Sequence, residues 1–140
     1  WELTTMQYLD KSPDVVFWGC ECIEIPYQLK KTNNLGEYKI TSHRYYPDFY
    51  YKLKLDNGSV KEILLEVKPR KETMAPVWKE TKRMTDNQLK NYEKSIDEWN
   101  RNISKWEATI EYCKSKEMDF KILVGEEVQR MIKDYINKFA

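Results

Sequence analysis

Two β-rich segments on either side of one turn place the tightest constraint on how this chain folds. Residues 44–55 (RYYPDFYYKLKL) and 60–68 (VKEILLEVK) are rich in aromatic and β-branched residues and flank Asp56-Asn57-Gly58. This arrangement predicts two strands joined as a β-hairpin. Because side chains alternate along a strand, each strand also has a defined apolar face. Those faces consist of Phe49, Tyr51, Leu53 and Leu55 on the first strand and Ile63, Leu65 and Val67 on the second.

The requirement that both apolar faces point into one core fixes the register of the hairpin. A three-residue loop with Leu55 opposite Ser59 meets this requirement, and Gly58 suits the left-handed conformation that such a loop needs. The register then puts Asp48 directly opposite Glu66.

The predicted Asp48–Glu66 pair is unusual because like charges directly opposed across strands are destabilising. Lys68 lies next along the same face, in a strand that is otherwise strongly apolar. A divalent cation between the two carboxylates would turn their repulsion into attraction, and Mg²⁺ or Mn²⁺ prefers such oxygen ligands. The spacing alone leaves a second interpretation open, in which the hairpin lies at a sheet edge and its polar face is solvated.

Composition indicates one globular domain that spans residues 1–140, long enough to bury a core. The formal net charge is only +1, so the chain has no overall basic field. Residues 68–83 are nevertheless locally basic, and a basic stretch of this kind can meet phosphates or form a solvated surface. Composition alone favours the solvated surface.

Cysteine and histidine content argues against a structural zinc site. Cys20 and Cys22 form a C-x-C pattern, Cys113 is distant, and the chain has a single histidine. We expect three reduced thiols in an intracellular protein.

No apolar run reaches the length of a membrane span, and no signal peptide is visible. The chain begins at Trp1 and not at Met, so we expect residues to precede it in the complete protein.

The remaining chain alternates helical and β-rich segments. We expect a helix at 1–10, one bent strand or two short ones at 15–27, and a turn at 33–36. After the hairpin we expect a long helix from about 74 to 117, a short buried strand at 120–124 and a closing helix at 126–139. The long helix carries an apolar stripe that predicts packing on a sheet or a partner helix. Its members are Leu89, Tyr92, Ile96, Trp99, Ile103, Trp106, Ile110 and Cys113.

Pro47-Asp48, followed on the neighbouring strand by Glu66-Val67-Lys68, resembles the PD-(D/E)xK nuclease superfamily. This resemblance implies an α/β fold with a restriction-endonuclease-like αβββαβ core. In that core a mixed central sheet is flanked by helices, and one long helix follows the catalytic hairpin. The stretches Trp1-Glu2, 43–49 and 105–107 are most similar to tailed-phage head-completion nucleases and related transposon endonuclease subunits.

The resemblance implies a Mg²⁺- or Mn²⁺-dependent DNA endonuclease that hydrolyses phosphodiester bonds. Asp48 and Glu66 would ligate the metal together with the Val67 carbonyl. Lys68 would orient or deprotonate the attacking water, a task that suits a lysine whose pKa is lowered by desolvation. Glu2 would bind or orient a second metal.

A further part of the resemblance concerns the long helix. RecB-like members carry a Gln-x-x-x-Tyr motif there, which corresponds to Gln88 and Tyr92. Gln88 would then hydrogen-bond near the metal site or the DNA backbone, although a simple polar role at the helix start fits it equally well. Candidate contacts to the DNA backbone are Arg44, Arg70, Lys71, Lys82 and Arg83.

The group that the chain resembles implies action on packaged DNA ends at a phage head. Partners would be DNA and phage head or portal proteins, and the location would be the host cytoplasm during assembly or the virion. Two alternatives stay open: a non-catalytic structural or DNA-binding head-completion protein, and a transposase-like or junction-resolving endonuclease subunit. No base-reading element is apparent, so we expect cutting that is non-specific or depends on DNA structure.

Overall fold

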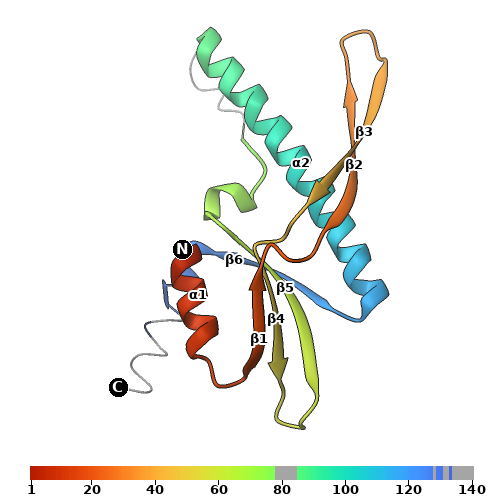
Figure 1. The fold of residues 1–140 in the computed structure, drawn as a ribbon. Coiled ribbons are helices and arrows are strands. Elements are labelled where there is room, and N and C mark those ends of the chain that lie inside the picture. The colour runs from red at the N-terminus through yellow and green to blue at the C-terminus, as the bar shows by residue number, and fades with distance from the viewer. Residues whose placement is uncertain (78–84, 128, 131–132, 134–140) are drawn as a thin grey trace.

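We describe the fold from a computed structural model, in which residues 1–77, 85–127, 129–130 and 133 are described. The N-terminal half contains α1 (Glu2–Lys11), β1 (Val15–Cys20), β2 (Ile25–Thr32), β3 (Tyr38–Tyr45), β4 (Phe49–Lys54) and β5 (Val60–Lys68). The 3₁₀ helix η1 (Arg70–Thr73), the long helix α2 (Asp86–Lys116) and β6 (Asp119–Val124) follow. Figure 1 shows how these elements are arranged.

The central sheet has the strand order β1-β4-β5-β6. Its first three strands are antiparallel neighbours, and β6 is parallel to β5. With the β2–β3 pair set aside, the element order α1-β1-β4-β5-α2-β6 is the αβββαβ core that the resemblance implied. The fold is therefore a restriction-endonuclease-like α/β fold with a mixed sheet and flanking helices.

The β4–β5 hairpin has the predicted register. Phe49 pairs with Leu65 and Tyr51 pairs with Ile63. The loop closes through a hydrogen bond of 2.8 Å from the Leu55 N–H to the Ser59 carbonyl, and Gly58 has a φ of 84°. Loop chemistry and the apolar faces were together sufficient to fix this part of the fold.

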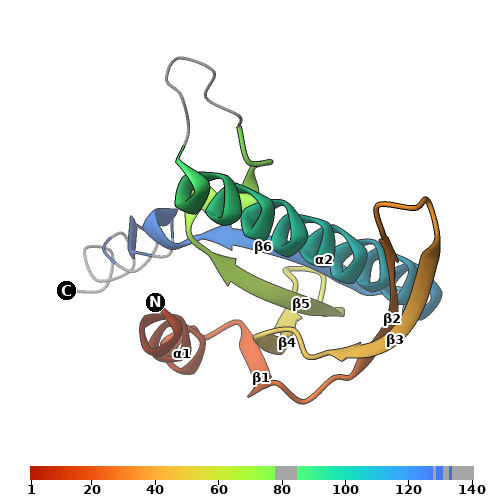
Figure 2. The same ribbon diagram turned by 90° about the horizontal axis from the view of Figure 1, so that it is seen from above.

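The two faces of the sheet are covered by different helices. Phe49 and Leu65 pack against Leu9 of α1, whereas Tyr50 and Leu64, one residue along each strand, pack against Cys113 of α2. Figure 2, seen from above, shows the two helices well separated on either side of the strands. The interpretation of the hairpin as a sheet edge with a solvated face is therefore wrong, because β5 lies between β4 and β6 and both of its faces are buried.

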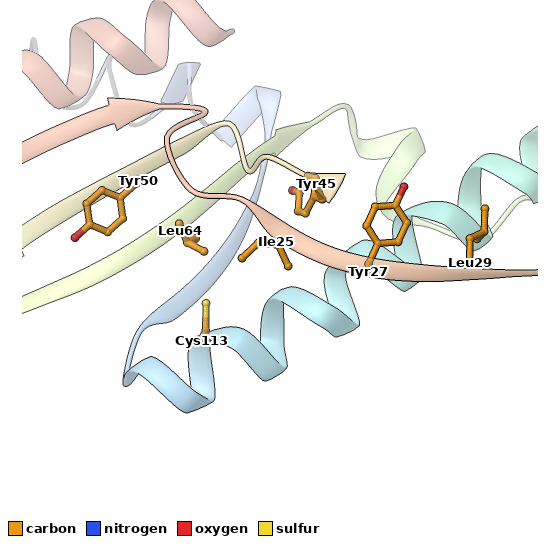
Figure 3. Packing of buried hydrophobic residues seen from close by; sticks show 7 residues of the cluster. All are labelled: Ile25, Tyr27, Leu29, Tyr45, Tyr50, Leu64 and Cys113. Carbon is orange, nitrogen blue, oxygen red and sulfur yellow. The ribbon is translucent and has the colours of Figure 1, made fainter. Parts of the chain in front are cut away.

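Strands β2 and β3 form a separate two-stranded sheet, which we call the arm. Its inner residues Ile25, Tyr27 and Leu29 join Tyr45 in the core that α2 covers (Figure 3). The prediction of one strand over 44–55 is wrong in this respect, because β3 ends at Tyr45 and β4 begins at Phe49 in the other sheet. The buried Pro47 lies at this change, where its missing N–H would interrupt a ladder.

Helix α2 begins later than the sequence pattern suggested. Residues 74–77 are not helical, so the predicted helix start near 74 is wrong for these four residues. The helix begins at Asp86, and Thr85 is its N-cap. Residues 78–84 lie outside the described residues, as does most of the predicted closing helix at 126–139. Its described residues, 126–127, 129–130 and 133, are helical. The apolar stripe is only partly buried: Trp106 and Cys113 are covered, but Leu89 and Ile110 are exposed.

Cys20, Cys22 and Cys113 are free thiols. Among the described residues, no helix combines the length and the apolar character needed to cross a membrane.

Truncation of Leu64 to alanine tests the role of the shared β5 core. Leu64 is fully buried between β5 and α2, so Leu64→Ala should lower the free energy of unfolding by about 2 to 5 kcal/mol. The measurement is urea denaturation followed by circular dichroism. Leu35→Ala, in the exposed turn of the arm, is the matched control and should change stability by less than about 0.5 kcal/mol. Equal losses in both variants would contradict this assignment of the core.

Candidate active site

The candidate site forms where the chain enters β4 and leaves β5. Asp48 directly precedes β4, and the β4–β5 register continues to bring it opposite Glu66. The Val67 N–H donates a 2.9 Å hydrogen bond to Oδ2 of Asp48, and the Asp48 N–H donates one of 3.3 Å to Oε2 of Glu66. The structure thus brings together the two carboxylates that the predicted register made neighbours.

Glu66 is a buried carboxylate, only 5% exposed. The hydroxyl of Tyr45, at the end of β3, donates to Oε2 of Glu66. The ammonium of Lys68 lies 3.5 Å from Oε1. Glu66 therefore has donors from β3, from the connection before β4 and from its own strand, and they satisfy much of its charge.

The surroundings of Asp48 disfavour the charged form of its carboxyl group when no metal is bound. Burial raises its pKa to about 6, and the negative charges of Glu66 and Glu2 add to the rise. The Val67 N–H and the charge of Lys68 oppose it. Protein groups alone therefore do not fully compensate the negative charge gathered at this site.

Tyr45 stays protonated at any ordinary pH. Burial is the largest reason that its pKa is raised, followed by the charge of Glu66 and the hydrogen bond to it, and a hydrogen bond involving Trp106 acts in the opposite direction. A protonated hydroxyl is a permanent donor, so Tyr45 fixes the orientation of the Glu66 carboxylate.

Glu2 lies at the start of α1, close enough to Asp48 to raise the pKa of Asp48. Trp1 anchors this end of the helix. The ring of Trp1 packs so closely on Gly125, just after β6, that a Cβ at position 125 would lie 2.2 Å from it. The N-terminus therefore meets the end of β6 (Figure 1), where Val124 pairs with Lys68 of β5.

Gln88 is not brought to the carboxylates. Its side chain accepts a hydrogen bond from the Thr85 N–H and completes a capping box at the start of α2. A position on α2 that lies near the carboxylates is Lys105, whose pKa Glu66 and Asp48 both influence and whose ammonium lies beside the ring of Tyr45. It is 17 residues further on, or about 25 Å along a helix. Gln88 therefore has the polar role at the helix start that fitted it equally well, and not the contact with the carboxylates.

The predicted DNA-binding residues lie in different places. Arg70 and Lys71 belong to η1, immediately after Lys68 and Pro69. Arg44 lies on the arm and forms a 2.8 Å ion pair with Glu24. Lys82 and Arg83 lie outside the described residues.

Two residues at the site escaped the sequence interpretation, Tyr45 and Lys105. Tyr45 ends β3, and strand alternation could not relate it to Glu66 because the chain changes sheets between them. Lys105 lies beside the apolar stripe of α2. The alternation of side chains along β5 could have indicated a contact with α2. Glu66 lies on the same strand face as Leu64, and α2 covers that face.

The donor set fits a hard divalent cation that keeps part of its water shell. Among the residues that the structure describes, no group of three His, Cys, Asp or Glu side chains is arranged to hold a metal. Two carboxylates are nevertheless enough for Mg²⁺, which usually retains several waters and binds one or two protein carboxylates. Oδ1 of Asp48 accepts neither of the hydrogen bonds described above, and Oε1 of Glu66 has only the loose contact with Lys68.

An αβββαβ core with paired acids and a lysine at the end of its central hairpin defines the class of restriction-endonuclease-like nucleases. The family described as "TnsA-like endonuclease N terminal" matches residues 12–125, and the chain belongs to this family. The chain is also similar to the head completion nuclease of Enterobacteria phage T4, with 31% identity over 126 residues that cover 90% of this chain and 75% of that protein. No solved structure matches. The chain is thus a nuclease related to phage head-completion and transposon endonuclease subunits.

The charge strain at Asp48 gives a pH-dependent prediction for the metal-free protein. The folded-state pKa of Asp48, about 6, lies above the ordinary value near 3.9. The folded state therefore binds the proton more tightly, and this carboxyl contributes stability at low pH that is lost as the pH rises through about 6. The amide of the Asp48→Asn variant would keep an acceptor for the Val67 N–H without a charge.

In EDTA, the stability advantage of Asp48→Asn over the wild type should grow between about pH 4 and about pH 7 and then level off. The measurement is urea denaturation of both proteins across this pH range. An advantage that is constant or shrinks with pH would contradict the electrostatic account.

Proposed function

We propose that this chain is a Mg²⁺-dependent endodeoxyribonuclease, and that residues 1–140 form one nuclease domain. The observation that carries the proposal is the convergence of Asp48, Glu66 and Lys68 at the end of β5, joined through backbone hydrogen bonds and one ion pair. Membership of an endonuclease family supports it independently.

Asp48 and Glu66 would hold Mg²⁺, or Mn²⁺, through the carboxylate oxygens that accept neither of the two backbone hydrogen bonds. The backbone carbonyl of Val67 would be a third protein ligand. In an extended strand the N–H and C=O of one residue point to the same neighbouring strand, and the Val67 N–H points to Asp48, so its carbonyl lies on that same edge. When bound, the metal supplies Lewis-acid stabilisation of phosphate charge and lowers the pKa of water.

Lys68 would orient or deprotonate the attacking water and offset charge on the phosphate. Its side chain is 23% exposed and its ammonium is 3.5 Å from Glu66, a separation too long for a tight hydrogen bond. The ammonium thus keeps donors for water or a phosphate oxygen while Glu66 limits its range of positions. Glu2, at the start of α1, is the candidate to bind or orient a second metal.

The DNA backbone would be contacted beyond the metal site. Arg70 and Lys71 of η1 are exposed and follow directly after the catalytic strand, and the local basic stretch continues in sequence to Lys82 and Arg83. Such contacts neutralise phosphates without reading bases. Cleavage would then be non-specific or depend on DNA structure.

The similarity to the phage T4 head completion nuclease supports a role in the completion of a phage head, where the chain would act on packaged DNA ends. Its partners would be head or portal proteins, and it would work in the host cytoplasm during assembly or within the virion.

The catalytic proposal is tested by nicking of supercoiled plasmid in Mg²⁺. Asp48→Asn, Glu66→Gln and Lys68→Ala should each lower the rate about 100- to 1,000-fold, because each removes charge stabilisation at the phosphate or its metal. Asp56→Asn, in the exposed β4–β5 turn, is the control and should cut like the wild type. Equal rates in the wild type and the three site variants would defeat the proposal and favour a non-catalytic head-completion protein.

Metal binding is tested without turnover by thermal unfolding. Mg²⁺ or Mn²⁺ should raise the melting temperature of the wild type because a ligand that binds only the folded state stabilises it. The rise should vanish in Asp48→Asn. An identical rise in both proteins would show that the ion binds elsewhere.

Tyr45 provides a finer test of how Glu66 is held. Removal of its hydroxyl in Tyr45→Phe should reduce activity or metal affinity about 10- to 100-fold, as is usual for groups that orient a ligand. Tyr46→Phe is the matched control, because Tyr46 is adjacent but exposed. Loss of activity in both variants, or in neither, would contradict the orienting role.

A further inference from the structure

Lys105 is a half-buried lysine in the middle of α2, beside the ring of Tyr45. Its ammonium lies 5.4 Å from the centre of that ring, a contact that stabilises a cation only partly. Across the described part of the chain, no carboxylate lies within ion-pair distance of Lys105. A partly desolvated charge without a counterion is costly, so this placement requires an explanation.

The surroundings of Lys105 increase that cost. Burial lowers its pKa, and repulsion from Lys68 is the largest contribution from another charge. Arg101, one helical turn earlier, adds a further repulsion, while Glu66 and Asp48 act in the opposite direction. Lys68 from β5 and Lys105 from α2 thus approach each other closely enough for their charges to interact.

The site therefore contains two opposite excesses of charge. Asp48 and Glu66 form an acidic pair that a divalent cation would relieve, and Lys68 and Lys105 form a basic pair that an anion would relieve. Tyr45 connects them physically, since its hydroxyl donates to Glu66 and its ring lies beneath the Lys105 ammonium. A phosphodiester phosphate bound through a metal presents its remaining oxygen to a cation of this kind.

We infer that Lys105 and Lys68 together bind one phosphate of the DNA, Lys105 from the α2 side and Lys68 from the β5 side. This inference rests on the proposed function and adds a phosphate-binding residue that neither the PD-(D/E)xK resemblance nor the expected Gln88 role supplied. Lys105 makes its contact from the rigid middle of a 31-residue helix, so it also sets how deeply the DNA strand enters the site.

The test compares Lys105→Met and Lys105→Arg with Lys114→Met. Lys114 lies on the same helix and its side chain is 71% exposed, which makes it the control. The first measurement is binding of a linear DNA duplex in EDTA at several salt concentrations. Loss of one phosphate contact should make the slope of log affinity against log salt shallower by about 0.9 in Lys105→Met, and Lys114→Met should keep the wild-type slope.

The second measurement is the single-turnover cleavage rate at saturating DNA in Mg²⁺. Lys105→Met should cut about 10- to 100-fold more slowly, the effect of a lost charge-assisted hydrogen bond, and Lys105→Arg should recover most of the rate because it keeps the charge. The melting temperature of Lys105→Met should not fall, since the variant removes a poorly compensated charge.

Three results would overturn the inference. One is a wild-type rate and salt slope in Lys105→Met. Another is a slower rate with an unchanged slope and a lowered melting temperature, which would mark a structural role. The third is an equal effect in Lys114→Met. If the wild type cuts DNA and Asp48→Asn does not, these results overturn only the role of Lys105. If Asp48→Asn cuts like the wild type, the proposed function itself fails.

Discussion

The buried carboxylate of Glu66 is the constraint around which the rest of the site is arranged. A carboxylate that is 5% exposed in an interior strand is tolerated only where donors surround it. The donors come from distant parts of the chain: the Tyr45 hydroxyl at the end of the arm, the Asp48 N–H before β4, and the Lys68 ammonium two residues on. Through these contacts one side chain joins the arm to the central sheet and sets the position of Asp48.

The position of this carboxylate could be predicted because it depends on short-range rules. The Asp56-Asn57-Gly58 loop and strand alternation fix which residues are opposed, and the observed pairs Phe49–Leu65 and Tyr51–Ile63 follow from them. Alternation also identified the strand face that Glu66 and Lys68 share. The order of the outer elements followed from their own apolar patterns. The likeness to a nuclease superfamily then implied the mixed sheet in which they are assembled, which pairing rules within one hairpin do not determine.

What could not be predicted depends on long-range packing. The sequence pattern continued through Pro47, so the transfer of the chain from the arm to the central sheet was missed, and with it the contact of Tyr45 with Glu66. The start of α2 was placed too early. The likeness to RecB-like nucleases suggested Gln88 for the site, whereas the structure has it in the alternative role that fitted equally well, at the helix cap. The packing of Cys113 of α2 against Leu64 of β5 decides which turn of this 31-residue helix passes the carboxylates. The spacing of apolar residues along the helix does not contain that information.

The two charge excesses at this site are better understood together than separately. Asp48 has a raised pKa and Lys105 a lowered one, so each is held in surroundings that oppose its own charged form. A structural ion pair would place acid against base and cancel both effects. Glu66 and Lys68 do form such a pair, but among the described residues neither Asp48 nor Lys105 has an ion-pair partner. Ionisable groups whose pKa is shifted and whose charge neighbouring residues leave uncompensated are typical of sites whose missing charges arrive with ligands. A cation and a phosphate bound together would satisfy both halves, which gives a physical reason why a protein would keep such an arrangement at some expense of stability.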